Sequence, residues 1–142
     1  MVNKNKAVFF DRDGVLNQTL IKNRKPYAPR NIEDFKIISN AKNVLNDLIS
    51  LNYLIFVVTN QPDVGNGYIK KSLVEKMHDI ILSELPVNQI FVCYHSQNDN
   101  CLCRKPKTGM LEQAYNKFNL DIKSCFLVGD RFSDIEAGKK FI

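Results

Sequence analysis

Acidic and polar side chains follow three short apolar runs of this 142-residue sequence. Asp11 and Asp13 follow the first run, Thr59 the second and Asp130 the third. Neighbouring carboxylates repel each other unless a cation lies between them, and Mg²⁺ with oxygen ligands removes that repulsion. A carboxylate can also attack phosphorus as a nucleophile. With Lys105 to screen the charge of a phosphate, these residue types indicate phosphoryl transfer.

A second cluster has the ligand types of a zinc site. Cys93-x-His95 and Cys101-x-Cys103 flank a short polar loop, and three thiolates with one imidazole can hold Zn²⁺ tetrahedrally. Four protein ligands leave no open position, so such an ion would be structural. The alternative is that Cys93 is a core residue at a strand end and the other cysteines are free thiols.

The two remaining residues of these types have simpler interpretations. Cys125 lies in an apolar run and is expected in the core. His78 lies beside Met77 in a predicted helix, where we expect a surface or half-buried position.

Hydrophobic patterning predicts the scaffold that brings the three polar strand ends together. Short runs that are apolar throughout alternate with segments of helical periodicity, which is typical of a parallel sheet covered on both faces. We therefore predict one doubly wound α/β domain over residues 1–142, with the zinc loop at 93–103 and no large cap domain. The predicted strands are 7–10, 54–58, 90–92 and 125–128, and the predicted helices are 41–51, 72–85, 109–118 and one beginning at Ser133.

The two ends of the predicted helices carry further expectations. Asn40 is a plausible N-cap of the first helix, and Ser133 with Glu136 forms a capping box at the start of the last one. That last helix runs into Phe141-Ile142, where the alternation predicts another strand. We therefore expect that a C-terminal strand of the native protein is missing from this sequence.

Composition narrows the partners. The sequence is 44% hydrophobic and 25% charged, and it has no apolar run near the roughly 18 residues of a membrane span. We expect a cytoplasmic monomer without a membrane partner. The net charge of +5 favours anionic partners, either phosphorylated metabolites or nucleic acid, although it can also serve solubility alone.

The ordered motifs resemble the haloacid dehalogenase superfamily of phosphohydrolases. Finer features resemble its heptose bisphosphate phosphatase and histidinol phosphatase branch, which is known for a Cys-x-His and Cys-x-Cys zinc loop at this place. The superfamily motifs are Asp11-x-Asp13-Gly14-Val15, Thr59-Asn60, Lys105 and Gly129-Asp130-x-x-x-Asp134, and the finer ones are Asp11 to Asn17, Thr59-Asn60-Gln61 and Cys103-Arg104-Lys105-Pro106.

This resemblance implies a role for each motif residue. Asp11 is the nucleophile, and Asp13 protonates the leaving alkoxide and then activates water. Asp11, the backbone carbonyl of Asp13 and Asp130 hold Mg²⁺, while Thr59 and Lys105 stabilise the transferring phosphoryl group. Asp134 is expected to support the metal site or the helix N-terminus. The remaining expected substrate contacts are Asn60, Gln61, Arg104 and Arg131.

The substrate is expected to be a small phosphorylated sugar. The resemblance implies removal of the 7-phosphate of a heptose bisphosphate, a precursor of surface polysaccharide, with histidinol phosphate as the alternative. Arg24 or Lys25, in the rim loop 21–30, would grip a second anionic group together with Arg104. A nucleic-acid 3′-phosphatase suits the charge but lacks a basic stripe with interleaved aromatic residues. A non-catalytic zinc-stabilised module gives no reason for the placement of Asp11 and Lys105.

Overall fold

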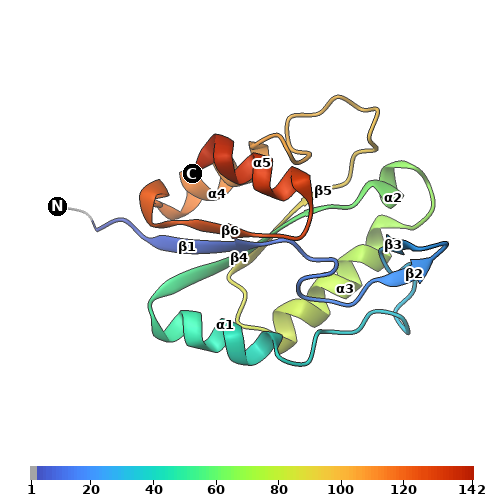
Figure 1. Cartoon of the computed structure of the whole chain (residues 1–142), viewed down its shortest axis with the longest axis horizontal. Helices are drawn as coiled ribbons and strands as arrows, with labels where there is room; N and C mark the ends of the chain where they lie inside the picture. The colour runs from blue at the N-terminus through green and yellow to red at the C-terminus, as the bar shows by residue number, and fades with distance from the viewer. Residues whose placement is uncertain (1–2) are drawn as a thin grey trace.

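The computed structural model, which describes residues 3–142, is built around a four-stranded parallel sheet (Figure 1). The strands are β1 (Lys6–Phe10), β4 (Tyr53–Asn60), β5 (Gln89–Cys93) and β6 (Phe126–Val128), in the spatial order β5-β4-β1-β6. Because β1 is central, the residues that follow it lie between those that follow β4 and β6.

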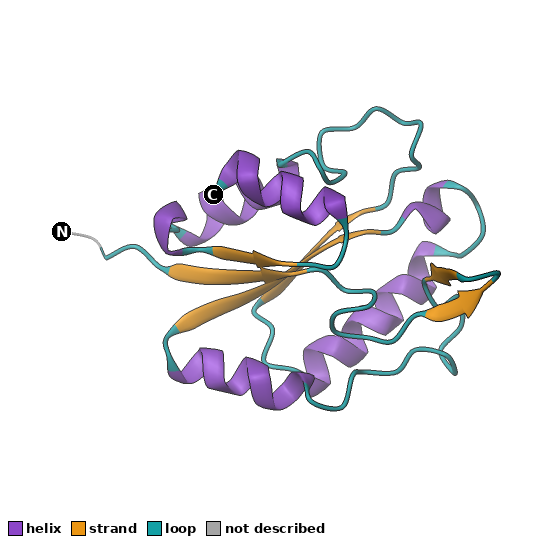
Figure 2. Cartoon of the chain, in the orientation of Figure 1, coloured by secondary structure: helices purple, strands orange, loops and turns teal. Residues whose placement is uncertain are grey.

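Helices cover both faces of this sheet (Figure 2). α1 (Ala41–Ser50) and α3 (Lys71–Glu84) lie on one face, and α4 (Gly109–Phe118) and α5 (Phe132–Phe141) lie on the other (Figure 1). The predicted doubly wound α/β class is confirmed.

Alternate residues of β1 pack against the two helical layers. Phe9 belongs to a buried cluster with Met110 of α4, whereas Phe10 belongs to a second cluster with Leu45 of α1 and Met77 of α3. A strand buried on both sides must be apolar throughout, which explains the continuous apolar runs in the sequence.

Most predicted elements are present, with shifted ends. β4 extends two residues beyond its predicted end and includes Thr59 and Asn60. The predicted capping box of Ser133 and Glu136 is wrong, because α5 begins one residue earlier, at Phe132. There the Asp134 carboxylate accepts a hydrogen bond from the backbone N–H of Arg131 at 3.2 Å. The expected Asn40 cap of α1 makes no side-chain capping hydrogen bond.

Three short elements were not predicted. β2 (Leu20–Lys22) and β3 (Lys25–Tyr27) form an antiparallel hairpin within the predicted rim loop, α2 is Pro62–Gly65, and a 3₁₀ turn spans Ile122–Ser124. The two hairpin turn residues, Asn23 and Arg24, have φ of 50° and 62°. Left-handed conformations at two successive positions are typical of tight two-residue hairpins, but an arginine there gives no sequence signal.

The β6 edge carries exposed apolar side chains. β6 pairs with β1 alone, and Phe126 and Val128 are 55% and 41% exposed. In residues 3–142 no strand follows α5, so the expected C-terminal strand stays a prediction. The helices in this described part of the chain are all too short or too polar to cross a membrane.

Candidate active site

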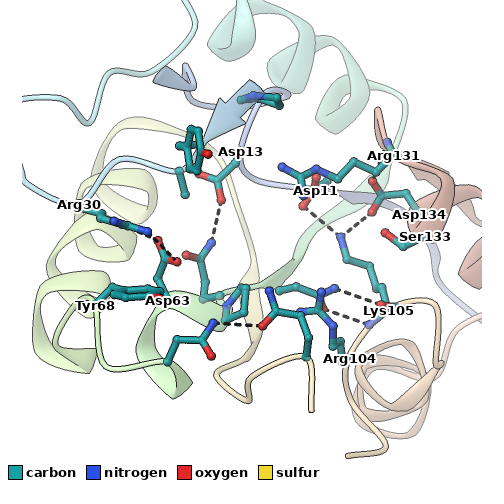
Figure 3. Close-up of a pocket in the computed structure, with 18 residues that line it drawn as sticks. Asp11, Asp13, Arg30, Asp63, Tyr68, Arg104, Lys105, Arg131, Ser133 and Asp134 are labelled. Atoms are coloured by element: carbon teal, nitrogen blue, oxygen red, sulfur yellow. Dashed lines mark hydrogen bonds and ion pairs between the residues drawn. The ribbon is translucent and has the colours of Figure 1, made fainter. Parts of the chain in front are cut away.

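The carboxyl ends of β1, β4 and β6 meet at one edge of the sheet and line a pocket of about 410 Å³ (Figure 3). Strand register explains this meeting, since Phe10 lies opposite both Val57 and Val128. The Asp11 backbone N–H continues the ladder by donating to the Val128 carbonyl at 3.0 Å. Ligands of open α/β sheets bind in the crevice outside such strand ends.

Lys105 joins two of the predicted acids at the centre of this pocket. Its Nζ lies 3.0 Å from Oδ1 of Asp11 and 2.5 Å from Oδ1 of Asp134, and all three side chains are buried (Figure 3). Burial raises the pKa of Asp11, and the Lys105 ammonium opposes that rise. A cation beside Asp11 therefore favours the carboxylate form that a nucleophile needs.

Asp13 is held by a separate set of hydrogen bonds. Its Oδ1 accepts from Arg12, at 2.7 Å from Nη2 and 3.1 Å from Nε, and from Asn17 at 3.0 Å. Its Oδ2 accepts from Nε2 of Gln61 at 2.9 Å. Burial alone would raise the pKa of Asp13, but the Arg12 charge and these hydrogen bonds outweigh it and bring the pKa below its usual value. Asp13 is therefore ionised at neutral pH.

Behind Asp13 lies a layer that sequence analysis did not find. Arg12 is completely buried, and its Nη1 lies 3.2 Å from Nε2 of His78. The expected surface or half-buried position of His78 is wrong, because this side chain is 6% exposed and packs under Arg12. Burial, and then the Arg12 charge, lowers the pKa of His78 to about 3, so the imidazole is neutral and its Nε2 accepts from Arg12.

The residues at the end of β4 position other site groups. Thr59 is completely buried, and its Oγ1 accepts from Gln61 at 2.9 Å. The Asn60 side chain bonds the Lys105 backbone twice, since Oδ1 accepts from N–H at 3.0 Å and Nδ2 donates to the carbonyl at 3.1 Å. Asn60 and Gln61 line the pocket as expected substrate contacts would, but in this structure they hold Lys105 and Asp13.

Three carboxylates form a group that could hold a cation. Oxygen atoms of Asp11, Asp130 and Asp134 lie within 4.8 Å of one another. Gly14 allows this close approach, because it has φ of +83° and a Cβ there would lie 2.6 Å from Oδ2 of Asp130. Oxygen donors of this charge fit Mg²⁺. The Asp13 side chain is outside the group, and its predicted contact is through the backbone carbonyl.

The predicted zinc ligands also converge. One ligand atom from each of Cys93, His95, Cys101 and Cys103 lies within 4.8 Å of the others. Nδ1 of His95 is 3.4 Å from the Cys93 sulfur and 3.2 Å from the Cys103 sulfur. Burial and then the Cys103 thiol raise the pKa of Cys93, so a bound cation is needed to hold these groups as thiolates. The donor set fits a tetrahedral Zn²⁺. Cys125 lies in the core, as predicted.

The basic residues expected at the rim divide into two groups. Arg104 and Arg131 line the pocket, and within residues 3–142 the buried Nη1 of Arg104 has no hydrogen-bond partner. Arg24 and Lys25 are exposed at the hairpin turn and do not line it, whereas Arg30, farther along the same segment, does.

The fold and this site define a class of protein. An aspartate pair after the first strand of a parallel doubly wound sheet, a lysine that bridges the first aspartate to an acid after the last strand, and a carboxylate group suited to Mg²⁺ make up a phosphatase core of the haloacid dehalogenase type.

Comparisons with known proteins agree with this class. The family model described as polynucleotide kinase 3 phosphatase matches residues 6–140. The chain is 39% identical over 140 residues to the D-glycero-alpha-D-manno-heptose-1,7-bisphosphate 7-phosphatase of Campylobacter jejuni, covering 95% of this chain and 77% of the relative. It is 33% identical over 144 residues to the D-glycero-beta-D-manno-heptose-1,7-bisphosphate 7-phosphatase of Helicobacter pylori strain J99, covering 97% and 79%.

Solved structures share the fold. The D,D-heptose 1,7-bisphosphate phosphatase of B. bronchiseptica, complexed with magnesium and phosphate, superposes with a TM-score of 0.81 at 23% identity, covering 96% of this chain and 75% of that one. The chain belongs to the polynucleotide kinase 3 phosphatase family of the haloacid dehalogenase superfamily.

Proposed function

We propose that this protein is a Mg²⁺-dependent phosphomonoester hydrolase that removes the 7-phosphate of D-glycero-D-manno-heptose 1,7-bisphosphate. The observation that carries the proposal is the Lys105 bridge between Asp11 and Asp134, beside Asp13 and in a pocket of about 410 Å³. The heptose substrate rests on relatives of at least 33% identity that carry this activity in their names.

The first half-reaction would be an in-line attack by a carboxylate oxygen of Asp11 on the phosphorus atom. The new Asp11 O–P bond forms as the bond from phosphorus to the sugar oxygen breaks, and the leaving oxygen takes a proton from Asp13. Lys105, 3.0 Å from Asp11, and the buried Thr59 would stabilise the charge on the transferring group.

Asp13 must gain that proton after substrate binds, because it is ionised in the free enzyme. A phosphate dianion placed beside it disfavours the carboxylate form and so raises the pKa of Asp13. In the second half-reaction the Asp13 carboxylate takes a proton from water, whose oxygen attacks phosphorus and releases Asp11 with inorganic phosphate. Gln61, at 2.9 Å from Asp13, keeps the carboxylate in one orientation for both steps.

Asp11, the Asp13 backbone carbonyl and Asp130 would hold Mg²⁺, which neutralises charge on the phosphate when bound. The Asp134 carboxylate, which also lies within this group, orients Lys105 and the start of α5. We assign Asp134 to that positioning role because its two oxygen atoms are already used in these contacts.

Zn²⁺ would be held by the four Cys and His side chains of the loop 93–103 and would be structural. The loop contributes to the pocket wall, since Gln97 accepts a hydrogen bond from Asn66 at 3.0 Å. Arg104, a proposed substrate contact like Arg131, directly follows the last ligand. A bound metal would therefore fix one side of the pocket.

A Mg²⁺-dependence assay on four phosphate esters tests this proposal. We expect phosphate release from a heptose 1,7-bisphosphate to exceed release from histidinol phosphate and from an oligonucleotide 3′-phosphate, and to stop when EDTA removes Mg²⁺. Both anomers should be compared, because the relatives include an alpha and a beta enzyme. Faster hydrolysis of histidinol phosphate or of the oligonucleotide would overturn the substrate assignment. A cytoplasmic, monomeric enzyme remains our expectation.

A further inference from the structure

The pocket has charged groups at two separate ends. Asp11, Lys105, Arg131 and Asp134 lie at the end where the proposed chemistry occurs, and Arg30 lies with its neighbours on the other side (Figure 3). Asp13 lies between these two ends in the view of Figure 3. A ligand whose reacting phosphate lies beside Asp11 could thus present a second charged group to the Arg30 end.

Arg30 is held in place at the rim. Its Nε and Nη2 donate to the carboxylate of Asp63 at 3.0 and 3.3 Å, and its guanidinium lies 4.6 Å from the centre of the Tyr68 ring. These contacts join the segment after the β2–β3 hairpin to the segment around α2. A side chain that is already fixed loses less conformational entropy when it binds a ligand.

Arg30 also keeps donors for a ligand. Its side chain is 42% exposed, and within residues 3–142 its Nη1 has no hydrogen-bond partner. A guanidinium can donate to Asp63 from one edge and to a phosphate from the other, because its five N–H groups point along separate directions.

The rest of the segment does not supply an alternative. It contains Lys22, Arg24, Lys25 and Arg30, and of these only Arg30 lines the pocket. Arg24 and Lys25 are exposed on the hairpin turn. The sequence prediction of an anion-binding residue in this segment therefore points to a different residue from the two it named.

We propose that Arg30 binds the second phosphate of the substrate, the one that is not hydrolysed, and so makes the enzyme prefer a bisphosphate to the corresponding monophosphate. This inference rests on the proposed function. Asp63 is a positioning residue that orients Arg30, and Tyr68 supports the guanidinium from below the pocket rim.

The experiment compares kcat/KM for heptose 1,7-bisphosphate and heptose 7-phosphate in the wild type and in Arg30→Gln. The ratio of these two values should fall about tenfold or more in the variant, mainly through KM for the bisphosphate, because a charge-assisted hydrogen bond to phosphate is lost. Lys42→Gln removes an exposed charge from α1 and is the matched control, with an unchanged ratio.

Three results would overturn the inference: an unchanged ratio in Arg30→Gln, an equal loss on both substrates, or the same fall in Lys42→Gln. Lys25→Gln tests the competing assignment, and a larger fall there than in Arg30→Gln would replace Arg30 by Lys25. If the wild type hydrolyses neither heptose ester but does hydrolyse other sugar phosphates, the proposed substrate is wrong. Fructose 1,6-bisphosphate and fructose 6-phosphate then provide the ratio, and the same three outcomes decide on Arg30.

Discussion

Arg12 donates from both Nη2 and Nε to a single carboxylate oxygen of Asp13, its neighbour in the chain, at 2.7 and 3.1 Å. The guanidinium is completely buried and Asp13 nearly so. A buried charge needs a partner, so Arg12 and Asp13 each supply what the other requires. The proposed acid and base is therefore fixed from inside the protein, while its other oxygen atom binds Gln61 at the pocket.

The first prediction concerns the stability of this pair. Arg12→Met should lower the free energy of unfolding by about 3 kcal/mol, because it leaves the Asp13 carboxylate buried without its cation. Urea unfolding followed by circular dichroism measures the change. Arg12→Lys keeps the charge and should lose less. A methionine variant as stable as the wild type would show that Asn17 and Gln61 are sufficient partners for Asp13.

The second prediction concerns the nucleophile. Asp11→Asn should lower kcat by about 10⁴-fold or more, since an amide oxygen does not form the covalent intermediate. The variant should keep its fold, because the amide remains able to accept the hydrogen bonds that Arg12 and Lys105 give to Asp11. Rates of phosphate release measure the loss, and Asp47→Asn, at an exposed position of α1, is the matched control. Turnover within tenfold of the wild type would exclude Asp11 as the nucleophile.

The strand ends of this site could be found from the sequence because the signal is local. Asp11, Thr59 and Asp130 each follow an apolar run, and parallel strands bring such positions to one edge. The Cys and His ligands were found for the same reason, since each pair lies within three residues. Their convergence needed the fold only to bring two short segments together.

The remainder of the site depends on contacts between distant parts of the chain. Arg12 and His78 are 66 positions apart, and neither residue type signals burial. Arg30 was part of a segment of routine surface charges until the Asp63 contact placed it at the pocket. The hairpin escaped prediction because Arg24 adopts a left-handed conformation that its residue type disfavours.

The third prediction uses the buried histidine. In the folded protein the pKa of His78 is about 3, below its usual value of 6.5, so the unfolded chain binds a proton more readily. The stability that His78 contributes is therefore present above about pH 6.5 and is lost as the pH falls toward 3, with a slope of at most about 1.4 kcal/mol per pH unit.

Unfolding free energies measured from pH 4 to 8 test this slope. His78→Gln keeps an oxygen that can accept from Arg12 but has no proton to gain, so its stability should fall less steeply than that of the wild type below pH 6.5. Lys76→Gln, at an exposed position of the same helix, should follow the wild type. Parallel curves for His78→Gln and the wild type would mean that His78 is protonated in the folded protein.

The fourth prediction links the Cys and His cluster to the pocket. Cys103→Ser should retain less than half of the zinc bound by the wild type and should lower phosphatase activity, because Cys103 lies within reach of both Cys93 and His95 and directly precedes Arg104. Zinc per protein is measured by atomic emission after dialysis, and activity is measured on the same samples. Cys125→Ser changes a cysteine outside the cluster and should keep the metal. Full activity in a zinc-free Cys103→Ser protein would separate the metal from the pocket, since Gln97 and Arg104 would then hold their places without it.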